Sequence, residues 1–227
     1  MLALNIKDNL INETLHFSTQ YLNASSAIFY WVDIDGQEMN VSETLDLPVG
    51  FLQDYNLNMR SLDPMRVSRM LASKDRVGVL SCEAIKHPQM EMASYIGHLG
   101  SFGVRDTIDL MFWNEGVAFG GVSFLKTDCD SDLMIAPQQL LSMQKFIEAS
   151  FVNHPRVKEI MLDVNLTAHG LSSREKAVVR HISSGYSNKD IAEVMSISVG
   201  TVKTYVNRIF EKLNVESRTE LAAQMLR

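Results

Sequence analysis

The chain has 227 residues, with 21 Lys and Arg against 27 Asp and Glu, so its formal net charge is −6 at pH 7. Hydrophobic residues make up 46% and charged residues 21%, which is ordinary globular composition and excludes a disordered or collagen-like protein. The length suits one large domain or two small ones. No apolar run approaches the roughly 18 residues of a membrane span, and Lys7 and Asp8 interrupt the apolar core that a signal peptide needs. We therefore expect a cytoplasmic protein that binds no membrane.

Helices and short strands alternate in the first part of the chain. Helical periodicity covers Asn9–Leu22, and Ala27–Asp33 has the composition of a strand that ends in a turn at Asp35-Gly36. The next predicted elements are a helix opened by Asp63-Pro64, with Pro64 at its first position, a strand at Val77–Glu83 and a helix at Met92–Leu99.

A hairpin and a long helix follow. Thr107–Trp113 and Val117–Leu125 are two strands around Asn114-Glu115-Gly116, since Asn and Gly tolerate positive φ. Ala136–Val152 is amphipathic, and this helix can form a dimer interface, pack on its own domain, or do both. This order is typical of a small α/β/α sensor of the GAF or PAS kind, with an antiparallel sheet. The whole chain is then α+β, with an all-α domain at the end.

The charge of the chain is unevenly divided. Residues 1–165 hold 12 basic and 21 acidic residues, a net −9, whereas residues 166–227 hold 9 and 6, a net +3. Because charges are screened beyond about 8 Å, the basic tail can attract phosphate despite the acidic body. His154-Pro155 ends a helical pattern. We expect a sensor and dimerisation domain at 1–153, a linker at 154–165 with a further connector at 166–170, and a basic domain at 166–227.

Four short helices are predicted in the basic segment. Ser172 and Glu175 fit a capping box at the start of the first helix, and Gly185 is a natural left-handed stop after it. The other three helices have N-caps at Ser187, Ser198 and Ser217, and the third runs from about Val199 to Leu213 before Asn214.

The second and third of these helices are joined by about three residues, which is the helix-turn-helix arrangement. An α-helix fills the major groove of DNA, and its N-terminal half meets the base edges. A small helical bundle without DNA contact is the alternative that the pattern leaves open. The exposed face of the third helix carries polar and cationic side chains, namely Thr201, Lys203, Thr204, Asn207 and Arg208, alongside Tyr205.

Residues 166–227 resemble, without a gap, the LuxR-type (NarL/FixJ-type) DNA-binding domain. The resemblance is carried by Leu171-Ser-Ser-Arg-Glu-Lys, Gly185-Tyr-Ser-Asn-Lys-Asp-Ile-Ala-Glu, Ile197-Ser-Val-Gly-Thr-Val-Lys-Thr-Tyr-Val and Ile209-Phe-Glu-Lys-Leu-Asn-Val-Glu-Ser-Arg-Thr-Glu-Leu. It implies a sequence-specific transcription regulator that binds double-stranded promoter DNA as a homodimer, with one recognition helix per half-site. RNA polymerase is a further partner that the resemblance suggests.

The same resemblance implies roles for single residues. Lys189, with Asn188 beside it, would bind phosphate from the bracing helix, and Val202 would either touch a thymine methyl group or pack in the core. Arg174-Glu175 and Arg218 would form an ion pair between helices. Two positions depart from the family pattern, Gly200 and Tyr205. The residues that would start the recognition helix or meet bases and phosphates are Thr201, Val202, Lys203, Thr204, Tyr205, Asn207 and Arg208.

A second resemblance lies in the first domain. The segment Leu47-Pro48-Val-Gly-Phe51-Leu-Gln-Asp-Tyr55 … Leu62-Asp63-Pro64 is similar to the ligand-site stretch of autoinducer-binding domains. The resemblance implies that Tyr55 binds an acyl carbonyl, that Asp63 accepts an amide N–H, and that Phe51 stands at a tryptophan position. Trp31 is a further candidate ligand contact. An ordinary helix cap at Asp63-Pro64 is the alternative.

Eleven of the 13 methionines lie in residues 1–165. Methionine adapts to irregular spaces, so the excess suits either a cavity for a small hydrophobic signal molecule or a plain core. Cys82 and Cys129 form no metal or redox motif, and Asp128–Gln139 lacks the glycine and glutamate of a calcium loop. We expect no cofactor, no metal and no enzyme activity.

Two functions are consistent with the sequence. The first is a ligand-responsive regulator in which a signal molecule changes the arrangement of a dimer, as in quorum sensing. The second is a regulator whose first domain binds no small molecule and serves only in protein interaction or dimerisation. Binding of a ligand, or its absence, distinguishes them.

Overall fold

The computed structural model describes residues 8–33, 35, 37–83, 89–127, 129–130 and 135–225. The chain divides into two compact units, Met1–Val152 and Asn153–Arg227. The first combines a sheet with helices, and the second is helical throughout the part described. In that described part, none of the helices has the length and apolar character needed to cross a membrane.

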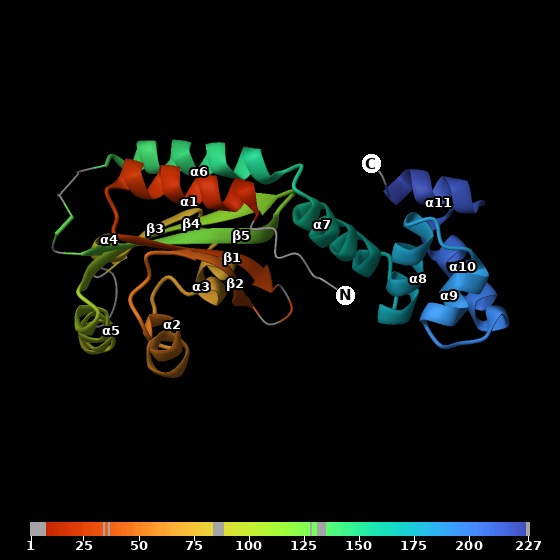
Figure 1. The fold of residues 1–227 in the computed structure, drawn as a ribbon, viewed down its shortest axis with the longest axis horizontal. Coiled ribbons are helices and arrows are strands. Elements are labelled where there is room, and N and C mark those ends of the chain that lie inside the picture. Colours follow the sequence, from red (N-terminus) through yellow and green to blue (C-terminus); the bar gives the residue numbers. More distant parts are fainter. Residues whose placement is uncertain are drawn as a thin grey trace. The chain divides into compact units, whose positions relative to one another are not determined.

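An antiparallel sheet of five strands, in the order β2-β1-β5-β4-β3, forms the centre of the first unit (Figure 1). The predicted hairpin is confirmed, and its turn holds Glu115 and Gly116 at positive φ. The strand β2 was not predicted, because its side chains are mostly exposed and polar and it lies at an edge. The strands are β1 (Ser26–Asp33), β2 (Glu38–Leu45), β3 (Val77–Val79), β4 (Val104–Asn114) and β5 (Val117–Thr127).

Two long helices, α1 (Asn9–Leu22) and α6 (Pro137–Phe151), lie side by side on one face of the sheet (Figure 1). Beneath them is an aromatic core. The rings of Phe29 and Phe151 stack with their centroids 5.2 Å apart, and Phe112 lies 6.3 Å from Phe151. We call the other side of the sheet the inner face.

The helices α2, α3 and α5 cover the inner face (Figure 1). Its buried cluster differs in character from the aromatic core, because tyrosines and methionines predominate over phenylalanines. The helices of this part of the chain are α2 (Phe51–Asp54), the π-helix η1 (Tyr55–Met59), α3 (Val67–Ser73), α4 (Leu80–Glu83) and α5 (Gln89–Ser101).

Two predicted elements of this region have different bounds. The helix expected to open at Asp63-Pro64 begins only at Val67, because the Asp63 carboxylate accepts the backbone N–H of Met65 and holds Pro64 in a turn. The strand expected at 77–83 ends at Val79, and the chain continues as the short helix α4. Gly36, assigned to the turn after β1, lies outside the described residues.

The second unit contains the four predicted helices and one more. The predicted linker and connector are largely helical, since α7 has Pro155 at its start, His154 as its N-cap and Leu166 buried near its end. This correction has a physical reason: Leu162 and Leu166 bury their side chains against the next helices. The helices are α7 (Pro155–Ala168), α8 (Ser173–Ser183), α9 (Asn188–Val194), α10 (Val199–Leu213) and α11 (Arg218–Met225).

Candidate DNA-binding surface and ligand site

The helix α10 is capped at both ends by residues of its own segment, Ser198 and Asn214. The Ser198 hydroxyl accepts the N–H of Thr201 at 3.0 Å, and Asn214 takes the left-handed conformation, with φ of 52°. Val202 is 0% exposed and packs in the core of the second unit. Of the two roles left open for Val202, packing in the core is therefore the one that the structure supports, and its listing as a DNA contact is wrong.

The opposite face of α10 is polar and open to solvent. Lys203 and Arg208 are exposed, and among the described residues neither has a hydrogen bond or ion pair. The Thr204 hydroxyl donates a hydrogen bond to the Gly200 carbonyl at 3.1 Å, so its proton is already used inside the helix and only its lone pairs remain for other contacts. Tyr205 is half-buried against the core. The solvent-facing residues are Thr201, Lys203, Thr204, Asn207 and Arg208.

The bracing helix α9 presents one of its two predicted phosphate contacts. Ser187 and Asp190 form a capping box, and Lys189 is exposed in the first turn. Asn188 is half-buried and accepts a hydrogen bond from Arg218 at 3.3 Å. Asn188 therefore has a positioning contact with Arg218, Lys189 is exposed, and the phosphate contacts expected of both residues stay predictions.

The expected ion pair between helices has a different cation. Glu175 is buried and accepts Lys212 Nζ at 2.7 Å; Arg218 instead donates to the Tyr186 carbonyl and to Asn188. Burial alone would raise the pKa of Glu175, but the hydrogen bonds from Lys212 and from Ser172 lower it to about 2. This pair fastens α10 to the start of α8.

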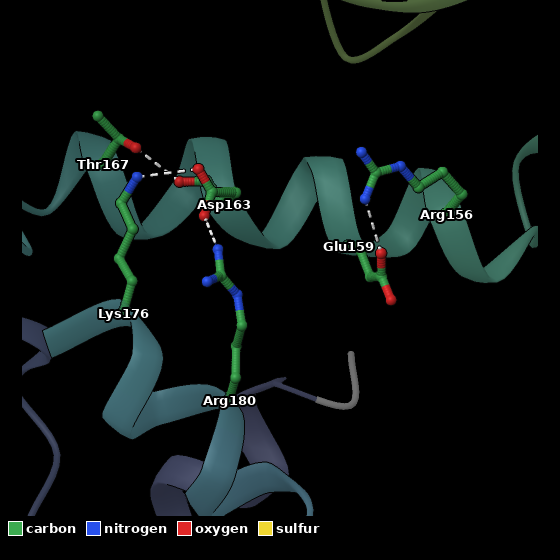
Figure 2. A network of polar contacts seen from close by, with 6 residues as sticks. All are labelled: Arg156, Glu159, Asp163, Thr167, Lys176 and Arg180. Atoms are coloured by element: carbon green, nitrogen blue, oxygen red, sulfur yellow. Dashed lines mark hydrogen bonds and ion pairs between the residues drawn. The ribbon is translucent and has the colours of Figure 1, made fainter. Parts of the chain in front are cut away.

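Two cations on α8, Lys176 and Arg180, are paired with a carboxylate of α7 (Figure 2). Lys176 donates to Asp163 at 2.9 Å, and Arg180 binds the other oxygen of the same carboxylate. Arg156 and Glu159 pair along α7 at 3.0 Å. Among the described residues, Lys203 and Arg208 on α10 have no such partners, so they are available to an external anion.

A second candidate site lies on the inner face of the sheet. Tyr55 donates its hydroxyl to Asp63 at 2.7 Å, and the Met65 N–H donates to the other carboxylate oxygen at 2.8 Å. Both side chains are buried, and burial raises the pKa of Asp63. Phe51 is buried with its ring centroid 6.4 Å from that of Tyr55. Three of the four predicted ligand residues are thus together.

The fourth, Trp31, is elsewhere. Side chains alternate along β1, so Tyr30 enters the inner face while Trp31 points to the opposite face. There its ring meets Phe29 at 5.1 Å and Phe151 at 6.3 Å. The assignment of Trp31 to the ligand site is therefore wrong.

Several residues of the inner face were missed. Tyr30, Tyr95 and Asp109 are buried there, and Asp109 accepts the Ser123 hydroxyl. The available signal was Asp109 itself, a carboxylate inside the otherwise apolar run of β4. Tyr55 also borders a cavity of about 410 Å³ that includes Met39 and Arg66. Among the described residues no cluster of three or more His, Cys, Asp or Glu could hold a metal.

Comparison with known proteins bears on the second unit most directly. Residues 169–225 match the family described as bacterial regulatory proteins, luxR family. The transcriptional regulatory protein DesR of Bacillus subtilis is 40% identical over 73 residues, which is 31% of this chain and 37% of that protein. The C-terminal helices therefore form a luxR-family DNA-binding domain, and the chain spans little more than a third of the length of DesR.

Two similarities extend over most of the chain. The monoamine regulon transcriptional regulator of Klebsiella aerogenes is 23% identical over 227 residues, covering 99% of this chain and 93% of that protein. The crystal structure of SdiA from Escherichia coli superposes with a TM-score of 0.49 at 18% identity, covering 94% of this chain and 87% of SdiA.

Proposed function

We propose that this chain is a ligand-responsive, dimeric transcription regulator that binds promoter DNA through α10. The observation that carries the proposal is the pair of exposed cations Lys203 and Arg208 on α10, which have no ion pair among the described residues of this luxR-family domain, whereas Lys176, Arg180 and Lys212 are each paired with a carboxylate. Lys203 and Arg208 would contact base edges and phosphates, with Asn207 between them. Such a regulator would act in the cytoplasm and, as an activator, would meet RNA polymerase.

DNA binding is tested with a site selected from random duplexes by the purified chain. Lys203→Ala should weaken binding at least fivefold and reduce the slope of log K against log salt by about 0.9, because one phosphate contact is lost. Arg208→Ala should weaken binding and relax base preference at one position. Lys158→Ala, an exposed lysine of α7, is the matched control. Unchanged binding by both α10 variants would refute the recognition-helix assignment.

Dimerisation is supported by an exposed aromatic surface on α1 and α6. Phe17 is 58% exposed, Tyr21 46% and Phe146 67%, and these side chains border a groove of about 540 Å³. The three side chains line this one groove and therefore form one patch, on two helices that lie next to each other (Figure 1). A protruding ring beside a groove suits an isologous contact, in which the ring of each copy inserts into the groove of the other. A second copy of this chain is the partner we propose.

The test is the oligomeric state in solution. Phe146→Asp should convert a dimer to a monomer in sedimentation equilibrium, because a charge would be buried in the contact. Val49→Asp, at an apolar residue that is 99% exposed outside this patch, should leave the dimer intact. A Phe146→Asp variant that stays dimeric would place the interface elsewhere.

Ligand binding is proposed at the inner face. Its buried Tyr55–Asp63 pair offers hydrogen bonding inside an apolar shell, as small-molecule sites do. The π-helix η1 carries Tyr55 and Met59, and such segments are frequent at functional sites. Mass spectrometry of small molecules released from purified protein tests the proposal. Empty protein, together with no thermal shift in fractionated cell extract, would favour a first unit that serves only in dimerisation.

A further inference from the structure

Gly200, one of the two departures from the family pattern, is a glycine that the fold does not require. It lies in the first turn of α10, and its φ is not positive. Among the described residues, a Cβ added there would meet only the Ser198 Oγ, at 3.6 Å, which is an ordinary van der Waals contact. Alanine stabilises a helix more than glycine does, so folding gives no reason for glycine here. The use that a missing side chain has at a binding surface is close approach of another molecule to the backbone.

Gly200 and Thr204 occupy the middle of the solvent-facing side of α10, and we call them the central pair. They are four residues apart, about one turn of helix, and both are exposed. Successive helical residues are about 100° apart, so both lie about 200° from Val202, which is 0% exposed. Lys203 lies on one flank of this pair and Arg208 on the other. A helix in the major groove turns the middle of its outward face to the base edges, so the central pair is placed to meet bases.

The hydroxyl of Thr204 is held against the helix, so its methyl group is what the side chain offers to a partner. The hydroxyl donates to the Gly200 carbonyl at 3.1 Å. The Cβ of threonine carries a hydroxyl, a methyl group and a hydrogen in staggered positions, so a hydroxyl fixed on the preceding turn leaves the methyl group directed away from that carbonyl. The central pair therefore presents a methyl group and bare backbone, with no side-chain proton left to donate.

This surface matches one feature of the major-groove code. Guanine presents two acceptors there, adenine and cytosine each present an amino donor, and thymine presents a C5 methyl group beside its O4 acceptor. A surface without a donor leaves the guanine acceptors unpaired, which costs free energy when water is excluded. The amino groups of adenine and cytosine would have to reach the Thr204 oxygen, which is turned toward the helix. The thymine methyl group instead gains from apolar contact with a threonine methyl group.

The glycine provides room for the base at the same place. The C5 methyl group projects from the edge of thymine into the groove, so a larger residue one turn before Thr204 would hold the helix away from it. Lys203 and Arg208 are exposed on the two flanks, and their long side chains can reach phosphates there. The helix can therefore be anchored on both sides while its middle lies close to the bases.

We infer that the base pair facing the middle of α10 is read through a thymine C5 methyl group, which packs between the Gly200 backbone and the Thr204 methyl group. The inference rests on the proposed binding of promoter DNA by α10 and names the base feature that is recognised there. Readout at this position is apolar, whereas the cations on the flanks supply most of the affinity through phosphate.

Uracil tests the methyl contact on the wild-type chain, because it differs from thymine only in lacking the C5 methyl group. An operator is selected from random duplexes by the full chain, each of its thymines is replaced singly by deoxyuridine, and affinity is measured by fluorescence anisotropy. One position in each half-site should lose about fourfold in affinity, the value of one buried methyl group. Equal affinity at every position would overturn the inference.

Two variants separate the Thr204 methyl group from its hydroxyl. Thr204→Ser removes the methyl group and should weaken binding to the thymine operator about fourfold, with no further loss on the uracil operator. Thr204→Val keeps a methyl group and should bind the thymine operator within about twofold of wild type. The reverse pattern, with loss in Thr204→Val and none in Thr204→Ser, would show that the oxygen accepts a base amino group and would overturn the inference.

Gly200→Ala separates DNA contact from a structural role. The added methyl group should leave the amides of α10 at least as well protected from hydrogen exchange, yet weaken binding to the thymine operator about tenfold, because the contact becomes overpacked. Part of this loss should be recovered on the uracil operator, which leaves room for the new group. Gly97→Ala, the same change in α5 with no other described atom within 4 Å of the new Cβ, should bind both operators as wild type does. Wild-type affinity of Gly200→Ala for the thymine operator would overturn the inference.

The outcomes distinguish this inference from the proposed function. Weaker binding by Lys203→Ala, with no effect of uracil or of Gly200→Ala, would overturn the thymine contact and leave α10 as the recognition helix. Unchanged binding by both Lys203→Ala and Arg208→Ala, or failure of the chain to select any duplex, would overturn both.

Discussion

The Glu175–Lys212 pair makes a quantitative prediction about the DNA-binding domain. Replacing Glu175 by Gln keeps the shape and the cap contact to Ser172 but removes the charge. The pKa of Glu175 falls from its ordinary 4.5 to about 2 in the folded chain. At about 1.4 kcal/mol per pKa unit, this difference corresponds to about 3.5 kcal/mol, and because the Lys212 side chain is 36% exposed, solvent screening lowers the expected loss of stability to about 2–3 kcal/mol at neutral pH.

Amide hydrogen exchange measures the loss of stability locally, in the two helices that the pair joins. Amides of α8 and α10 should exchange about thirty- to a hundredfold faster in Glu175→Gln, because their protection follows the free energy of opening. Trp31 and Trp113 are the only tryptophans, and both lie in the first unit. Their fluorescence in urea should therefore show an unchanged transition, and Glu193→Gln, at an exposed glutamate of α9, should alter neither signal.

The pH dependence of the stability difference between the wild type and Glu175→Gln tests whether the charge of Glu175 is the cause. A carboxyl whose pKa is lowered by folding stabilises the chain above its unfolded value of about 4.5, and the contribution is lost as the pH falls through about 2. The variant and wild type should therefore converge in stability near pH 2. Lys212→Met should cost a similar amount, and the double variant should cost less than the sum. Additive effects, or unchanged protection at pH 7, would show that the pair does not hold α10.

Three other changes test the fold and the sites. Gly121→Ala should destabilise the first unit by about 1–3 kcal/mol in urea unfolding, because the new Cβ would lie 2.7 Å from the Leu110 carbonyl oxygen; a neutral effect would contradict this packing. Without ligand, the stability of the wild-type chain should decline between about pH 4 and pH 8, by at most about 1.4 kcal/mol per pH unit, because Asp109 loses its proton in the unfolded state first. Asp109→Asn should remove this slope, and equal slopes in the variant and the wild type would argue against a raised pKa of Asp109. Ser198→Ala should cost about 1 kcal/mol in exchange protection of α10 and weaken DNA binding, and full protection would show the cap to be dispensable.

The helical domain was predictable because its signals are local. Ser172, Ser187 and Ser198 each cap a helix within three residues, and Asn214 ends α10 by its own conformation. Such features do not depend on distant partners. The four helices predicted in residues 166–227 therefore agree with the structure, whereas the helix α7 and the contacts between helices, such as the pairing of Glu175 with Lys212, were missed.

The first unit was less predictable because its site is assembled from distant segments. The face of β1 on which Trp31 lies depends on strand pairing, and β2 pairs through exposed residues that give no apolar pattern. Asp109 and Tyr95 are brought to Asp63 only by the packing of β4 and α5 on the inner face. The resemblance to autoinducer-binding domains supplied Tyr55 and Asp63, which are eight residues apart and hydrogen-bonded.

The carboxylate of Asp163 has a mechanical consequence. Because the Asp163 carboxylate ties α7 to Lys176 and Arg180 of α8, the fourteen residues of α7 should move with the DNA-binding domain as one rigid helix. In the proposed ligand-responsive regulator, the only backbone between α6 and α7 is Val152–His154, the three residues that separate these two helices. Under that proposal, proline or glycine introduced at these three residues changes the response to ligand while leaving the helices of each unit in place.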